Sequence, residues 1–238
     1  MMKKIEKILC SILMVSIMIS GTVFASDATN LDLKEQKKYE ELKKEGVLGE
    51  DVSYNEWRSL NEESKMLEKS LTESTDFIEV YSTPGESAGG SYNMKTGDVF
   101  ITNGTSSSGL TGHSGIAIST SQILHIAGPG KTPKTISLSA WNSGYSKKGW
   151  TRVYRHSNSK TATAAGNWAS KKYKGSSAKY KITSDLTSTK ETYCSKIVWQ
   201  AYYYGPSSPS ISGTTTGIKI PYGLPNTIKN IYKIKTFG

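Results

Sequence analysis

The hydrophobic pattern of this chain changes its period near residue 76, and that change limits the fold more than any other feature. Before it, residues 29–73 place apolar side chains at helical spacings among Glu and Lys, which predicts two helices. After it, short runs such as Asp98 to Thr102 alternate at period 2, which predicts strands. Helical spacing returns at Thr163 to Tyr173 and at Cys194 to Tyr204. The chain is therefore predicted to be an α+β protein.

The first residues read as an export signal rather than as part of the fold. Lys3, Lys4 and Lys7 precede an apolar run of signal-peptide length that ends near Ile19. Small residues before Ser26 then predict cleavage after Ala25, so 1–25 is assigned as a signal peptide. The alternative is an uncleaved membrane anchor. The mature protein is therefore expected to be secreted or extracytoplasmic, and associated with the cell wall.

Charge divides the mature chain into two parts. Residues 26–75, the expected helical hairpin, carry 8 basic and 13 acidic side chains, whereas residues 76–238 carry 19 basic and 6 acidic ones. The hairpin is therefore expected to dock on the basic domain 76–238 as a prosegment, a lid or a packing element. An exported basic domain suits an anionic wall polymer or a lipid head group as partner, although a solvated basic surface is the simpler reading. Nucleic acid is not expected, because no nucleic-acid motif accompanies the charge.

Cysteine usage points to one candidate nucleophile. The chain holds Cys10 and Cys194, and signal cleavage removes the first, so the mature protein has no internal disulfide. Cys194 falls within the first two turns of its helix, after a capping box at 188–191 or a cap at Thr192. Free N–H groups and the helix dipole at such a position favour a thiolate. Cys194 is therefore predicted to be a nucleophile, the alternative being an inert core cysteine.

Of the three histidines, His113 is the candidate base for that thiol. Alternation along its strand places His113, Gly115 and Ala117 on one face, and the small residues allow another element to approach closely. The Cys194 helix is therefore expected to lie on this face and to bring its thiol to the imidazole.

His125, on the next strand, is expected to orient His113. A three-residue turn that sets residue 118 opposite 122 also sets 115 opposite 125, which makes His125 a diagonal neighbour of His113. A slip of one residue would point it away. His156 is read as a surface histidine. No cluster of His, Cys, Asp and Glu has metal-ligand spacing, so no metal or other cofactor is predicted.

Three motifs in this order resemble the circularly permuted members of the NlpC-like papain superfamily, including YiiX-like and YycO-like proteins: Gly97-Asp98-Val99-Phe100, Gly112-His113-Ser114-Gly115-Ile116, and the run from Tyr193 to Ala201. In permuted members the histidine strand precedes the cysteine helix, as it does here. The resemblance covers about residues 95–205. It implies a papain-like domain in which a small antiparallel sheet packs against the cysteine helix. It also implies an acyl-thioester on Cys194, with His113 as base and His125 as the residue that holds it.

Three functions remain open on this reading. The first is a secreted cysteine amidase or peptidase that cleaves peptidoglycan stem peptides or another extracytoplasmic peptide. The second is a lipid amidase, esterase or acyltransferase. The third is a non-enzymatic wall-binding protein that keeps the fold. Substrate and oligomeric state are left open by the sequence.

Overall fold

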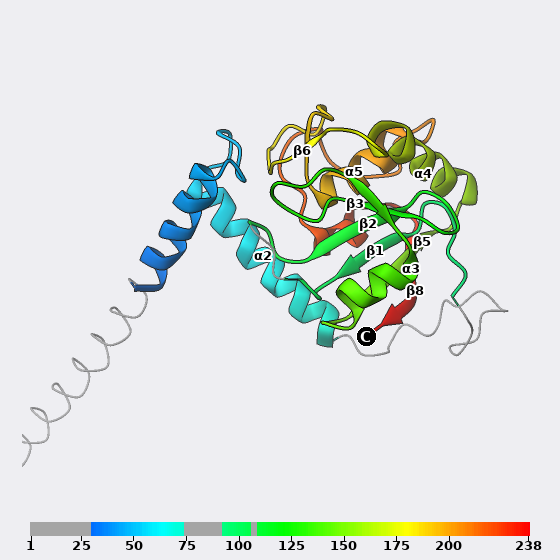
Figure 1. Ribbon diagram of the computed structural model, residues 1–238, viewed down its shortest axis with the longest axis horizontal. Helices are drawn as coiled ribbons and strands as arrows, with labels where there is room; N and C mark the ends of the chain where they lie inside the picture. Colours follow the sequence, from blue (N-terminus) through cyan, green and yellow to red (C-terminus); the bar gives the residue numbers. More distant parts are fainter. Residues whose placement is uncertain (1–29, 74–91, 106–108) are drawn as a thin grey trace, which may run out of the picture. The chain divides into compact units, whose positions relative to one another are not determined.

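The computed structural model describes residues 30–73, 92–105 and 109–238 (Figure 1). The expected signal peptide and the expected strand from Phe77 to Tyr81 lie outside these ranges. The chain divides into two compact units, residues 1–41 and residues 42–238. Within the described ranges, every helix is too short or too polar to serve as a transmembrane span.

The first unit contains most of a helix over residues 30–44, close to the expected span from Leu31 to Lys44. The helix ends where Gly46 adopts a positive φ of 69° and donates its N–H to the carbonyl of Lys43. Glycine is the usual residue for this left-handed closing position, because it has no Cβ to clash with the backbone.

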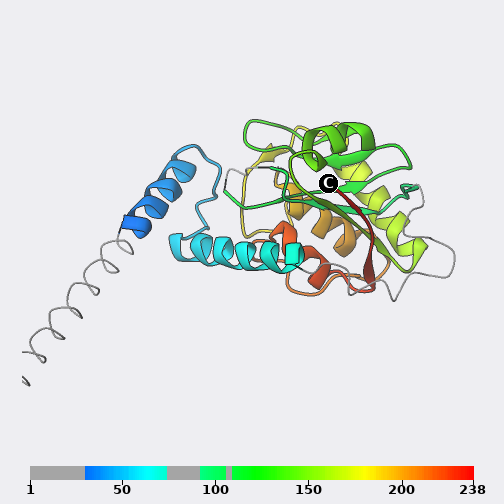
Figure 2. The same cartoon turned by 90° about the horizontal axis from the view of Figure 1, so that it is seen from below.

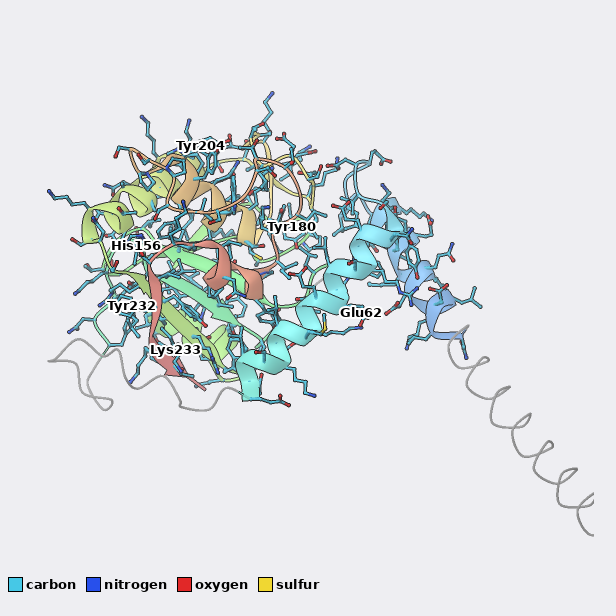
Figure 3. All side chains as sticks on the ribbon, turned by 180° about the vertical axis from the view of Figure 1, so that it is seen from behind. Glu62, His156, Tyr180, Tyr204, Tyr232 and Lys233 are labelled. Atoms are coloured by element: carbon cyan, nitrogen blue, oxygen red, sulfur yellow. The ribbon has the colours of Figure 1, made fainter. Side chains whose placement is uncertain are left out.

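The second unit is built on a six-stranded antiparallel sheet in the order β4-β3-β2-β1-β5-β8. Its strands are short: β1 Val99–Thr102, β2 His113–Ala117, β3 Ile123–His125, β4 Lys134–Ile136, β5 Thr151–His156 and β8 Ile231–Phe237. A separate parallel pair joins β6 Lys179–Tyr180 to β7 Glu191–Thr192. Strand β8 brings the end of the chain to the sheet edge, where Figure 3 labels Tyr232 and Lys233.

The helices of this unit differ widely in length. Their bounds are α2 Tyr54–Glu73, α3 Leu138–Trp141, the π-helical turn η1 Asn142–Ser146, α4 Ser159–Tyr173, α5 Cys194–Tyr204, η2 Pro221–Gly223 and α6 Leu224–Thr227. The observed α5 has the bounds that the sequence predicts, and α4 begins four residues earlier than predicted because Asn158 caps it. The α+β class is confirmed. Helix α3 and the turn η1 were not predicted.

Two hydrophobic cores lie on opposite faces of the sheet, and the ribbon shows helices on both sides of it (Figure 2). Helices α4 and α5 cover one face, where their apolar side chains pack on alternate strand residues that include Val99, Ile101, Ile116 and Leu124. On the other face, α3 brings Trp141 against Phe100, Ala117, Ile123 and Val153. The four inner strands β3, β2, β1 and β5 therefore bury both of their faces, whereas the edge strands β4 and β8 are partly exposed.

A buried ion pair joins two central strands. Arg155 on β5 donates to both carboxylate oxygens of Asp98 just before β1, at 2.8 Å each. The Tyr92 hydroxyl donates to the same carboxylate at 2.6 Å. Breaking such a pair leaves a buried charge without compensation, so the Gly-Asp motif at residues 97–98 has a structural role here.

Helix α2 belongs to the same compact unit as the sheet. Ser53 caps its start by accepting the Glu56 N–H at 3.2 Å. Further along, the Trp57 indole N–H donates to the carbonyl of Gly109 at 2.7 Å, and Thr72 accepts from the Trp150 indole at 3.0 Å. The second helix of the expected hairpin therefore contacts the loops at one end of the sheet along its whole length.

Candidate active site

Cys194 is the first residue of α5 and the free cysteine among the described residues. The residue before it, Tyr193, has extended backbone angles and supplies no side-chain cap, while Glu191–Thr192 forms strand β7. The cap predicted at 188–192 is therefore wrong, and the helix begins directly at the cysteine. The first N–H groups of a helix have no partner within the helix, and the Ser195 backbone interacts with the Cys194 side chain.

The thiol is buried, with only 6% of the residue exposed. Burial raises the pKa of Cys194 above its ordinary value, and interactions with Ser114 and Ser195 lower it by less. This shift runs against the ionised thiolate that the sequence predicts, because removal from water outweighs the hydrogen bonds from Ser114 and Ser195. The Ser114 hydroxyl makes no hydrogen bond of good geometry, although it lies close enough to the sulfur to favour its charge.

His113 and His125 form a hydrogen-bonded pair. His113 Nε2 lies 3.0 Å from His125 Nδ1, and the two rings meet edge to face with centroids 5.2 Å apart. Strand pairing sets Ile116 opposite Leu124, and Ile118 donates to the carbonyl of Gln122 at 2.9 Å. This is the predicted register, and it explains why the two imidazoles share a face.

Both imidazoles are neutral near neutral pH. Burial lowers the pKa of His125 to about 4. Burial and the neighbouring His125 hold the pKa of His113 well below its usual range. Each neutral ring has one N–H donor and one acceptor nitrogen, so their hydrogen bond uses one nitrogen of each. When His113 donates through Nε2, its Nδ1 is left as a free basic nitrogen.

The structure corrects the predicted face of the cysteine helix. Helix α5 packs on the face of β2 that carries Ser114 and Ile116, not on the face of His113, Gly115 and Ala117. The small residues instead admit Trp141, since a Cβ at Gly115 would lie 2.8 Å from the Trp141 ring. The Cys194 thiol meets β2 at Ser114, the residue that follows His113 in the chain. Among the described residues, no hydrogen bond joins the sulfur to either imidazole.

Sequence reasoning missed two aromatic residues that enclose the histidine pair. The ring of Trp141 stacks on His113 with centroids 5.5 Å apart and planes 15° apart. Tyr145 lies over the same imidazole at 4.9 Å, and its hydroxyl is 3.4 Å from His125 Nδ1. Their spacing of four residues places both on one side of the α3–η1 segment. That spacing was visible in the sequence, but nothing there indicated which face of the sheet the segment would cover.

The tail of the chain supplies another residue near the site. Tyr222 lies against Gly112, where an added Cβ would be 2.5 Å from the tyrosine ring, and Gly112 has a φ of 80°. Burial, the Glu68 carboxylate of α2 and Cys194 all raise the pKa of the Tyr222 hydroxyl, in that order. Helix α2 therefore reaches the immediate surroundings of the thiol through Glu68. The Ser/Gly/Pro-rich composition of the tail concealed this contribution.

His156 is buried rather than exposed, which corrects its prediction as a surface residue. Its Nδ1 lies 2.9 Å from the backbone nitrogen and 3.2 Å from the carbonyl oxygen of Asn158, and its Nε2 lies 2.8 Å from the Ser210 hydroxyl oxygen. This histidine ties β5 to the tail and takes no part in the pair. Within the described ranges, no group of three or more His, Cys, Asp and Glu side chains is placed to hold a metal ion.

Comparisons with known proteins place the chain in a family. The family described as "Lipoprotein N-acylation protein LnsA-like" matches residues 66–237. An uncharacterized 30.3 kDa protein of Bacillus thuringiensis is 36% identical over 270 residues, which span 98% of this chain and all of that protein. Among solved structures, the metalloprotein YiiX of Escherichia coli O157:H7 aligns with a TM-score of 0.42 and 14% identity, over 60% of this chain and 98% of that one. The chain therefore belongs to the LnsA-like family of lipoprotein N-acylation proteins.

Proposed function

We propose that this protein is a cysteine acyltransferase that carries an acyl group from an ester to an amine through a thioester on Cys194. The observation that carries the proposal is the site itself: a cysteine at a helix start, beside the β2–β3 hairpin whose two strands bear a hydrogen-bonded histidine pair. Family membership supplies the reaction class, because N-acylation requires an activated acyl group and an amine acceptor. The acceptor class is the free amine of a lipoprotein.

In the first half-reaction, the thiol of Cys194 attacks the carbonyl carbon of the ester. The C–S bond forms, the C–O bond breaks, and His113 accepts the thiol proton and returns it to the leaving alkoxide. We assign to the N–H groups at the start of α5 the stabilisation of the oxyanion that forms on the carbonyl oxygen. Because the thiol and the imidazoles rest in their neutral forms, proton transfer accompanies attack rather than preceding it.

In the second half-reaction, the acceptor amine attacks the thioester. The C–N bond forms, the C–S bond breaks, and a proton from the amine passes through His113 to the sulfur. His125 holds the His113 ring through the 3.0 Å hydrogen bond during both steps. No hydrogen bond joins sulfur and imidazole at rest, so the thiol side chain must turn toward His113 once the acyl donor is bound.

Two features favour transfer over hydrolysis. The sulfur is nearly excluded from solvent, so water has little access to a thioester formed there. The family description names acylation rather than cleavage. Amide cleavage of wall peptides, which sequence analysis placed first, has no comparable support. The same proposal includes an extracytoplasmic location, which rests on the expected export signal at 1–25. It also includes an anionic lipid surface as partner, since the domain 76–238 is strongly basic.

The test uses the protein without residues 1–25, a phospholipid acyl donor and a synthetic diacylated lipopeptide with a free N-terminal amine. Intact-mass spectrometry should detect an acyl adduct on Cys194, and product analysis should detect the N-acylated lipopeptide. The variant Cys194→Ala should lose both while keeping its circular dichroism spectrum, and His156→Gln serves as a matched control with normal turnover. Undiminished transfer by Cys194→Ala would refute the mechanism. Free fatty acid or cut wall peptides as the main product would instead establish a hydrolase.

A further inference from the structure

Two hydrogen-bonding groups converge on a single nitrogen of His125. His113 Nε2 lies 3.0 Å from His125 Nδ1, and the Tyr145 hydroxyl lies 3.4 Å from the same atom. A neutral imidazole nitrogen offers either one lone pair or one hydrogen, never both. The contacts therefore depend on which tautomer His125 adopts.

Tyr145 is held in this position from both sides of the π-helical turn. Its ring lies against Trp141 with centroids 4.7 Å apart, and the Trp141 indole donates to Thr151 at 3.1 Å. The carbonyl oxygen of Tyr145 lies so close to Gly104 that a Cβ added at this glycine would be 1.9 Å from it. A π-helical turn is uncommon and occurs often at functional sites. The contact with Trp141 holds the Tyr145 ring, and the contact with Gly104 holds its backbone, so the hydroxyl stays beside His125.

The two tautomers of His125 have opposite consequences for His113. If Nδ1 of His125 carries the lone pair, His113 donates through Nε2 and keeps Nδ1 as a free base. If Nδ1 of His125 carries the hydrogen, His113 accepts through Nε2 and its own hydrogen must sit on Nδ1, which leaves no free basic nitrogen. A phenol hydroxyl donates more readily than it accepts. Burial raises the pKa of Tyr145 to about 12, so the hydroxyl keeps its proton throughout the neutral range.

We propose that Tyr145 is a positioning residue that selects the Nε2–H tautomer of His125 and thereby fixes Nδ1 of His113 as the base. This inference rests on the proposed function, in which His113 accepts the thiol proton. Tyr145 acts through the two imidazoles and need not touch the substrate. One full neutral hydrogen bond changes an equilibrium constant by about fivefold. Because the Tyr145 hydroxyl lies 3.4 Å from Nδ1 and shares its lone pair with His113, about fivefold is the upper limit of the expected tautomer preference.

The experiment labels the histidines with ¹⁵N and reads each ring nitrogen by long-range ¹H–¹⁵N correlation in the absence of substrate. In the unaltered protein, His125 Nδ1 should give a pyridine-type shift and His113 Nε2 a pyrrole-type shift. The variant Tyr145→Phe keeps the ring but removes the donor, so both shifts should move toward the averages of mixed tautomers. Acyl-enzyme formation should slow by about two- to fivefold, in line with the loss of one neutral hydrogen bond. The matched control Tyr232→Phe, on the edge strand β8 (Figure 3), should change neither.

The outcomes separate this inference from the proposed function. A hydrogen on Nδ1 of His125 in the unaltered protein overturns the inference without any variant. Unchanged histidine shifts in Tyr145→Phe overturn it as well, and the shifts of His156 report whether that variant keeps its fold. If instead Cys194→Ala retains transfer, the proposed function fails, while the tautomer measurement still decides the role of Tyr145.

Discussion

The buried histidine pair should make the stability of this protein depend on pH in a specific way. The folded-state pKa of His125 is about 4, whereas an unfolded chain has a histidine pKa of about 6.5. Because the folded value is the lower one, the unfolded state takes up the proton first as pH falls. The stabilisation by neutral His125 is therefore complete above the unfolded pKa and is lost as pH falls toward the folded pKa. Linkage gives a loss of about 2.5 kcal/mol between about pH 7.5 and about pH 4.5.

The assay is urea denaturation followed by tryptophan fluorescence at those two pH values. The unaltered protein should lose about 2.5 kcal/mol more unfolding free energy between them than His125→Gln does, because glutamine does not titrate. Removal of His125 also relieves the smaller part of the lowering of the His113 pKa, the part that His125 causes, which adds to the difference in the same direction. The control His156→Gln should differ less from the unaltered protein in this pH-dependent loss of unfolding free energy, since burial lowers the pKa of His156 less than that of His125. Equal pH dependence of the unaltered protein and His125→Gln, within about 0.5 kcal/mol, would refute the reasoning.

Further predictions concern the thiol, its base and the backbone near them. Alkylation of Cys194 by iodoacetamide should rise steadily with pH up to at least about pH 9, because burial raises the thiol pKa; a plateau between about pH 5 and pH 8 would show an ion pair instead. His113→Ala should slow acyl-enzyme formation by about 10²- to 10⁴-fold in intact-mass time courses, and an unchanged rate would exclude it as the base. Gly112→Ala should cost at least about 1–2 kcal/mol in thermal unfolding, because its φ is positive and the Tyr222 ring occupies the Cβ position; an unchanged melting temperature would contradict this. Asp98→Ala should cost about 3–5 kcal/mol in urea denaturation by leaving a buried guanidinium unpaired, and a loss under about 1 kcal/mol would count against the buried pair.

Local sequence pattern determined most of the secondary structure and one part of the site. The period of the apolar residues specified β1, β2, β5 and α5, because period and burial are linked within each element. The short turn after Ile118 determined the register of β2 against β3, and this register determines which residues of the two strands lie opposite each other. The pairing of His113 with His125 was therefore readable from the sequence, since both residues lie within one hairpin.

Tertiary structure decided the rest of the site, because those features depend on segments far apart in the chain. The small residues beside His113 indicated that another element packs closely on that face of β2, but not whether this element would be α5 or α3. The inner strands are covered on both faces. Only the tertiary structure shows that Trp141 packs on one face and Cys194 on the other. The pKa of the Cys194 thiol was likewise decided by tertiary structure. A helix start favours the thiolate locally, yet the surrounding fold removes Cys194 from water, and desolvation is the larger effect. Sequence thus pointed to the candidate nucleophile and to the histidine pair, while folding set their electrostatic surroundings and their neighbours.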